Sequence, residues 1–280
     1  MKQLLTDSIG LIDLLIWLLV IFFFCGSALL FGGDLTLSFI GAGGVIVEMM
    51  IIGICIEVII ESLKQTRGIG TITGFITNGP EAVCLIVGLA VGDILFAAST
   101  PLGSNFMNPL LLFIAALLCR QFIPVLRCRP LYSVTTIVVT ACFAGGFFFI
   151  AESHYLLWLV GAFAISTPLF FMRPGEPEPL PGDGDIAHPK HWLLPAVILL
   201  IGAGYLLDGV VSFAAEHSRA PKGVIGFFVL ATLTSWPEFK SCLSLLNRGK
   251  VLAAILNITV SNVTNIWLAI LGVGTYLVLR

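Results

Sequence analysis

Apolar runs of about 20 residues, separated by short polar stretches, recur along the whole chain, and a run of this length spans a bilayer as an α-helix. The first run lacks a small-residue cleavage site, so it is interpreted as a retained helix and not as a signal peptide. The pattern predicts an all-α polytopic membrane protein with about nine transmembrane helices, at residues 11–32, 38–62, 70–91, 94–119, 131–151, 154–172, 192–214, 222–247 and 251–279.

Two polar segments interrupt the apolar pattern, and one is a copy of the other. The first contains Thr77-Asn78-Gly79-Pro80-Glu81, followed by Ser104, Asn105 and Asn108. The second contains Thr234-Ser235-Trp236-Pro237-Glu238, followed by Ser261, Asn262 and Asn265. The polar residues match without a gap, because one offset of 157 positions relates 81 to 238, 104 to 261 and 108 to 265. Such a match indicates two copies of one membrane hairpin.

The two copies are expected to cross the membrane in opposite directions. The helices predicted at 70–91 and 222–247 are five spans apart, and an odd number of spans reverses the direction. Inverted-topology repeats of this kind place a binding site near the bilayer midplane, where the repeats meet. The repeats divide the chain into N-terminal helices (1–69), the first hairpin (70–119), connecting helices (120–172), a Pro-rich acidic cytoplasmic linker (173–191), and a second half (192–280) that contains the second hairpin (222–279).

The basic residues predict the orientation of the chain in the membrane. With the N-terminus in the cytoplasm, most lysines and arginines fall on the cytoplasmic side, as the positive-inside rule requires. These residues are Lys2, Lys64, Arg67, Arg120, Arg127, Arg129, Arg173, Lys190, Arg248 and Lys250. Arg219, Lys222 and Arg280 fall on the opposite side.

Composition excludes several classes of protein. The chain is 58% hydrophobic and 11% charged, with a mean hydropathy of +1.06, far from the averages of soluble domains. The net charge of −2 and the absence of a basic stripe argue against nucleic acid as a partner. The seven cysteines lack metal-ligand spacing and are interpreted as small apolar side chains. No nucleophile–base constellation, cofactor loop or metalloprotease motif occurs, so neither enzymatic activity nor a cofactor is expected.

Each copy places a Pro-Glu pair in the middle of a span. Proline cannot donate a backbone hydrogen bond, and the acceptors that it frees are tolerated only where the backbone is buried or lines a wet cavity. An ionised carboxylate there costs about 2.5–3.5 kcal/mol and needs a partner. Carboxylate, hydroxyl and amide oxygens are ligands of hard cations such as Ca²⁺ and Na⁺. The predicted cation ligands are Glu81, Glu238, Thr77, Asn78, Ser104, Asn108, Thr234, Ser235, Ser261 and Asn265.

Three other polar features admit more than one interpretation. Asn105 and Asn262 either belong to the site or hydrogen-bond two helices together. Lys240 has two interpretations. Its side chain extends to the cytoplasmic surface or pairs with a carboxylate, or it is a tethered cation that replaces a transported ion. Glu57 and Glu61 either pair with the nearby Lys64 or attract cations at the cytoplasmic end. The linker is interpreted as a semi-rigid tether, because it is short, acidic and rich in proline.

The two copies resemble the alpha-repeats of the sodium/calcium exchanger (cation/calcium antiporter) superfamily, whose patterns run approximately G-T-S-x-P-E and G-S-N-x-x-N/D. The resemblance covers roughly residues 70–119 and 200–275, and this chain departs from it at Asn78 and Val260, which replace a serine and a glycine. It implies exchange of Ca²⁺ for Na⁺ by alternating access, with Glu81 and Glu238 as central ligands. The family normally has five spans per half, so the span at 11–32 is expected to be an additional helix.

We therefore expect a secondary-active cation antiporter in the inner or plasma membrane, with its N-terminus in the cytoplasm. Its substrates would be Ca²⁺ and Na⁺ (or H⁺), and its partners inorganic cations and the lipid bilayer. Two alternatives stay open at this point: a Ca²⁺/H⁺ or Na⁺/H⁺ antiporter, whose glutamates carry protons, and a non-transporting, ion-sensing membrane subunit. The oligomeric state is not indicated by the sequence.

Overall fold

The structure, a computed structural model, describes residues 9–92, 94–177, 190–220, 229 and 232–279. These residues form helices and short connections, without a β-strand among them. The α-helices are α2 (Leu11–Phe31), α3 (Leu35–Leu63), α4 (Ile69–Ile76), α5 (Gly79–Val91), α6 (Ile94–Leu118), α7 (Phe122–Arg127), α8 (Pro130–Phe147), α9 (Tyr155–Phe171), α10 (Leu193–Ser218), α12 (Trp236–Asn247) and α13 (Val251–Leu279). Two single-turn 3-10 helices are η1 (Glu152–His154) and η2 (Lys190–Trp192).

Eight helical segments of the described chain are long and apolar enough to cross a membrane. The predicted all-α polytopic membrane fold is thereby confirmed. The span predicted at 222–247 begins outside the described residues, and α12 forms its second part. The span predicted at 70–91 consists of two helices, because α4 ends at Ile76 and α5 starts at Gly79. Pro80 lies in the first turn of α5, where a missing N–H is harmless and the helix can restart.

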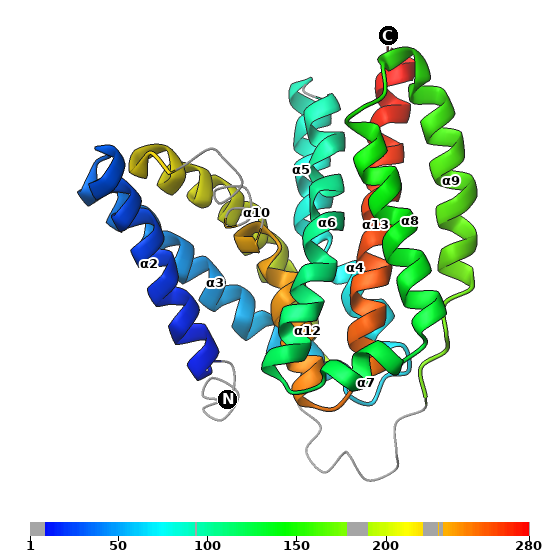
Figure 1. Cartoon of the computed structure of the whole chain (residues 1–280), viewed down its shortest axis with the longest axis horizontal. Helices are drawn as coiled ribbons and strands as arrows, with labels where there is room; N and C mark the ends of the chain where they lie inside the picture. Colours follow the sequence, from blue (N-terminus) through cyan, green and yellow to red (C-terminus); the bar gives the residue numbers. More distant parts are fainter. Residues whose placement is uncertain (1–8, 93, 178–189, 221–228, 230–231, 280) are drawn as a thin grey trace.

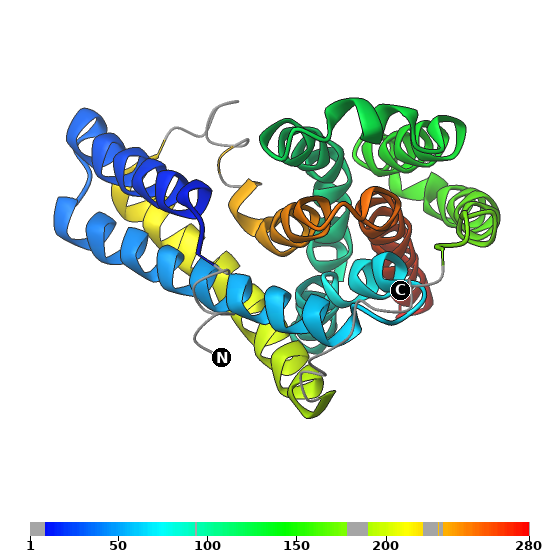
Figure 2. The same ribbon diagram turned by 90° about the horizontal axis from the view of Figure 1, so that it is seen from below.

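The helices gather in two groups (Figures 1 and 2). α2, α3 and α10 lean together on one side, whereas α5, α6, α8, α9 and α13 stand side by side on the other. α3 and α10 pack closely because small residues line their contact. A methyl group added to Gly41 would lie 2.8 Å from the Cβ of Ala214 on α10. α2 packs on both α3 and α10, outside the two repeats.

The second hairpin is inverted relative to the first. In Figure 1, α6 runs downward along the chain whereas α13 runs upward beside it. The two helices are matched by symmetric hydrogen bonds between equivalent residues 157 positions apart. The Asn105 side-chain amide donates to the backbone carbonyl of Asn262 at 3.2 Å, and the Asn262 amide donates to the carbonyl of Asn105 at 3.4 Å. This reciprocity is what a two-fold axis between inverted copies produces.

Two glycines allow α4 to lie directly on the backbone of α13. A Cβ at Gly70 would collide with the carbonyl oxygen of Ala253, and one at Gly74 would lie 2.7 Å from the carbonyl oxygen of Asn257. The glycines are four residues apart, so they share one helix face and form a small-residue contact strip. Rigid backbone atoms on the opposite side cannot move away from a side chain.

Gly70→Ala should therefore destabilise the protein by about 1–3 kcal/mol, the usual cost of overpacking. Thermal unfolding in detergent measures this effect as a lower Tm. Gly26→Ala is the matched control, because an added Cβ at Gly26 on α2 meets no atom within 4 Å. Equal Tm values for the two variants would contradict the close contact between α4 and α13.

Charged residues near the ends of α3 and α12 form a network. Arg248 Nη2 lies 2.8 Å from Glu57 and 3.5 Å from Glu61, and Lys64 lies 2.6 Å from Glu61. Lys250 donates to the backbone carbonyl of Lys64 at 2.8 Å. The expected pairing of this acidic pair with Lys64 is confirmed for Glu61, whereas Glu57 pairs with an arginine of the second hairpin.

The first part of the predicted linker is attached to the first repeat. Glu176 is buried, and its carboxylate accepts hydrogen bonds from the backbone N–H groups of Gly70, at 3.0 and 3.1 Å, and of Thr71, at 3.2 Å. These N–H groups belong to the first turn of α4, where N–H donors lack helical partners and a negative charge is favoured. The linker is thus more than a tether, at least at this residue; positions 178–189 lie outside the described residues.

Candidate cation-binding site

The two predicted glutamates occupy equivalent places at the start of a half-helix. Glu81 lies in the first turn of α5 and Glu238 in the first turn of α12. The N-terminus of a helix carries a partial positive charge, which favours a carboxylate in its first turn. Because α5 and α12 run in opposite directions, their N-terminal ends meet near the middle of the molecule (Figure 1). Broken helices with facing ends form the ion sites of many transporters.

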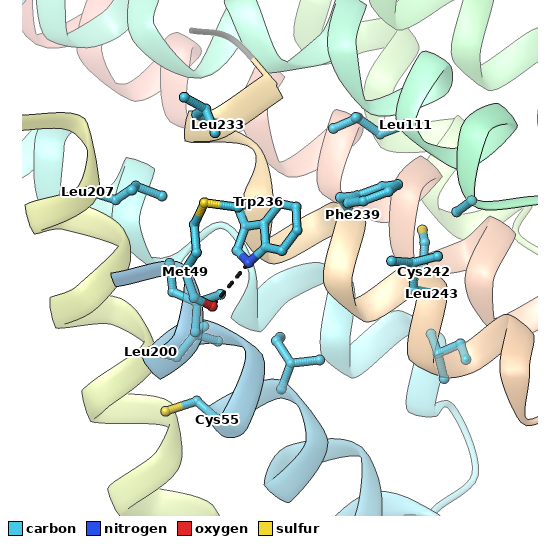
Figure 3. Close-up of a cluster of buried hydrophobic side chains, with 14 of the residues drawn as sticks. Met49, Cys55, Leu111, Leu200, Leu207, Leu233, Trp236, Phe239, Cys242 and Leu243 are labelled. Atoms are coloured by element: carbon cyan, nitrogen blue, oxygen red, sulfur yellow. Dashed lines mark hydrogen bonds between the residues drawn. The ribbon is translucent and has the colours of Figure 1, made fainter. Parts of the chain in front are cut away.

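The start of α12 is held in place by a buried tryptophan (Figure 3). Trp236 is 1% exposed, and its indole N–H donates to the backbone carbonyl of Met49 on α3 at 3.1 Å. Phe239 and Leu233 are also buried in this apolar cluster. An indole with its N–H satisfied is a rigid anchor. It positions the backbone two residues before Glu238.

Both glutamates are buried close to the other predicted ligands. Glu238 is 0% and Glu81 8% exposed, and the two carboxylates are near enough to interact electrostatically. The hydroxyl groups of Thr77 and Ser261 lie beside Glu238, and Ser104 lies beside Glu81. Residues from both repeats therefore converge on one place, as the duplicated pattern predicts.

The two asparagines at the ends of the repeated motifs make equivalent hydrogen bonds. The Asn108 amide donates to the side-chain oxygen of Asn262 at 3.0 Å and to Ser261 Oγ at 3.1 Å. The Asn265 amide donates to the side-chain oxygen of Asn105 at 3.2 Å. Asn105 and Asn262 thus join α6 to α13, which supports their interpretation as packing residues. Their hydrogen bonds also orient the amides of Asn108 and Asn265.

Several buried oxygens of this cluster accept no hydrogen bond of normal geometry within the described part of the chain. They are both carboxylate oxygens of Glu238, Oε2 of Glu81, Oδ1 of Asn108, Oδ1 of Asn265, and the hydroxyls of Thr77 and Ser235. Leaving a buried polar group unsatisfied is costly, so nearly all are paired in native proteins. A cation bound among them would satisfy several at once. Oxygen donors around two carboxylates suit hard cations such as Ca²⁺ and Na⁺.

The site is closed on one side and open on the other. On the closed side, Asn78 donates to the backbone carbonyl of Ser261 at 2.8 Å, and the Ser261 hydroxyl donates to Asn78 Oδ1 at 2.7 Å. In the repeat, Ser235 corresponds to Asn78 and Ser104 corresponds to Ser261. These two serines do not form the matching closed contact but line a pocket of about 100 Å³. Glu81, Thr234 and Asp208 also line this pocket. The repeats are therefore similar in sequence but different in local arrangement.

Two important residues were not predicted as parts of the site. Asp208 of α10 lines the open pocket; its sequence signals were its position inside an apolar span and within the stretch 200–275 that resembles the family. Asp13 of α2 binds Lys240, whose ammonium donates to both carboxylate oxygens at 2.7 Å. The pairing interpretation of Lys240 is thereby confirmed. Its partner lies 227 positions away, a distance over which no sequence pattern applies.

Comparisons with known proteins agree with the repeated motif. Residues 192–279 match the family model described as "Sodium/calcium exchanger protein". A curated protein of Alkalimonas amylolytica, named "Putative antiporter CaxA", is 27% identical to this chain over 225 residues, covering 73% of this chain and 68% of the relative. No solved structure matches. The second part of the chain is thus similar to sodium/calcium exchanger proteins, and its long apolar helices are those of an integral membrane protein. The matches support a cation/calcium antiporter.

Proposed function

We propose that the chain exchanges Ca²⁺ for Na⁺ across the membrane by alternating access between its two inverted hairpins, 70–119 and 222–279. The observation that carries this proposal is the set of buried, unsatisfied acceptor oxygens where the hairpins meet. The proposed ligands are Glu81 and Glu238, assisted by Thr77, Asn78, Ser104, Asn108, Thr234, Ser235, Ser261 and Asn265. Neither ion is a cofactor; both are substrates.

Two buried carboxylates explain why exchange would be coupled. Without a cation, Glu81 and Glu238 place two like charges near each other inside a membrane, which is costly. One Ca²⁺ or several Na⁺ ions offset these charges. The protein would therefore change its accessible side when loaded and resist the change when empty. Competition of both ions for the same carboxylates then links their movements.

The asymmetry of the repeats supports a state open to one side. Asp208, which lines the pocket, lies nearer the Ser218 end of α10 than its Leu193 end, and Leu193 follows the linker, whose basic residues Arg173 and Lys190 are expected in the cytoplasm. With basic residues in the cytoplasm, the open side is external. In the opposite state, Ser104 and Ser235 would approach each other. The hydrogen bonds between Asn78 and Ser261 would break.

A second candidate is exchange of Ca²⁺ for H⁺. The carboxylates of Glu81 and Glu238 can each take a proton, and neither forms an ion pair with another described residue. Protons would then replace Na⁺ as the ions that compete with Ca²⁺. The site geometry serves either chemistry, and the driving gradient separates them.

The test is uptake of radioactive Ca²⁺ into proteoliposomes under an imposed Na⁺ gradient, repeated under a pH gradient. We expect the Na⁺ gradient to drive uptake and a choline gradient of equal size to drive none. Uptake under the pH gradient alone would assign the chain as a proton antiporter. Folded protein that moves Ca²⁺ under neither gradient would be an ion-sensing subunit, and the transport proposal would fail.

A further inference from the structure

We propose that Asp208 and Glu81 form an outer cation-binding site in the open pocket, ahead of the central site, and that it takes partly hydrated Ca²⁺ from the water on that side. The role of this site in transport rests on the proposed function, whereas the binding of a cation to the site does not. Asp208 lies on α10, outside both repeated motifs. Nothing in the repeat pattern assigns it a role.

The position of Asp208 requires water next to it. At a rise of about 1.5 Å per residue, it lies about 15 Å from the Ser218 end of α10 and about 22 Å from the Leu193 end. It is therefore well inside the apolar span, yet its side chain is exposed. A carboxylate facing lipid at that depth is costly. The pocket that it lines offers a polar surface instead, and the pocket leads to Glu81.

Two buried groups face the same pocket with unsatisfied oxygens. Glu81 is 8% and Ser235 1% exposed, and Oε2 of Glu81 and Oγ of Ser235 accept no hydrogen bond from a described residue. Asp208 and Glu81 are near enough to repel each other electrostatically. A cation between the two carboxylates removes this repulsion and gives the unsatisfied oxygens a partner.

The size of the pocket fits an ion that keeps part of its water. Its volume of about 100 Å³ is well above the roughly 10–15 Å³ that one water needs, so the pocket has room for an ion with some of its water. Ca²⁺ takes about 6–8 oxygen ligands. Asp208, Glu81, Ser104 and Ser235 can supply some of these ligands, and water supplies the others. An ion held here has lost part of its hydration before it reaches Glu238, which does not line the pocket.

An outer site has a specific kinetic signature. It raises the local concentration of cation and acts before the translocation step. Asp208→Asn should therefore raise the KM for Ca²⁺ supplied at the external side by about three- to tenfold, with kcat unchanged. The KM for Ca²⁺ supplied from the cytoplasmic side should not change. Asp208→Glu, which keeps the charge, should restore most of the external affinity.

Glu216→Gln is the matched control for the kinetics. Glu216 lies on the same helix, two turns beyond Asp208, is exposed, and does not line the pocket. Its replacement removes the same charge near the same end of α10. External KM values are measured with cells or vesicles of known orientation. An unchanged external KM in Asp208→Asn, or an equal rise in Glu216→Gln, would overturn the proposal.

Direct binding separates this inference from the transport proposal. Tb³⁺, a luminescent substitute for Ca²⁺, is titrated into purified Glu238→Gln protein, with excitation through the tryptophans. We expect a site that Ca²⁺ displaces and that is lost in the Glu238→Gln/Asp208→Asn double variant. Binding that depends on Asp208 in a protein without Ca²⁺ flux would uphold the outer site and reject the antiporter. Binding unaffected by Asp208→Asn would reject the outer site whatever the flux shows.

Discussion

Glu238→Gln should lower Na⁺-driven Ca²⁺ flux by about 100-fold or more. Removing one partner of a buried charge interaction costs about 2–5 kcal/mol, and about 1.4 kcal/mol corresponds to a factor of ten. Glutamine preserves the size of the side chain and removes only its charge. Because Glu238 is fully buried, water cannot replace the lost interaction. Ca²⁺ flux into proteoliposomes measures the effect, and Glu81→Gln should behave similarly.

The control for this loss of flux is Glu216→Gln, an exposed carboxylate outside the central site. It should transport at the wild-type rate. The Tm of Glu238→Gln should equal or exceed that of the wild type, because a buried unpaired charge has been removed. Flux close to wild type in Glu238→Gln would show that the carboxylate is not a cation ligand. Lost flux together with a lower Tm would point to misfolding.

Asp13→Asn should destabilise the protein by about 3–5 kcal/mol, the cost of breaking a buried ion pair by removing one partner. The side chains of Asp13 and Lys240 are each 7% exposed, and the ammonium reaches both carboxylate oxygens. Asparagine keeps the shape of Asp13 but leaves a buried positive charge without its carboxylate. Thermal unfolding in detergent should show a clearly lower Tm.

A double variant distinguishes lost charge from lost packing. Asp13→Asn/Lys240→Met removes both charges and should recover most of the stability, because replacing a whole buried pair is often neutral. If the single variant has the same Tm as Glu216→Gln, the ion pair contributes nothing to stability. If the double variant is as unstable as the single one, packing at Asp13 is responsible. The same pair joins α2 to α12, which carries Glu238.

The helices and the break within them follow from local properties of the sequence. The run predicted at 11–32 is α2, Leu11–Phe31, because the thickness of a bilayer sets the length of an apolar helix. Pro80 predicts the interruption between α4 and α5, because proline cannot continue a helix past its own position. The duplicated motifs also predict that Glu81 and Glu238 share one environment. Identical sequence patterns in inverted copies make equivalent contacts wherever the symmetry holds.

Only the tertiary structure decides which distant residues meet and where the symmetry fails. Asp13 and Lys240 pair across 227 positions, and Glu176 reaches the start of α4 across 106 positions. No periodicity relates such residues, because their proximity results from how whole helices pack. The hydrogen bonds between Asn78 and Ser261 close one side, whereas the equivalent Ser235 and Ser104 line an open pocket. Nearly matching sequences can adopt both arrangements, so the open side is a property of the packed conformation and not of either repeat alone.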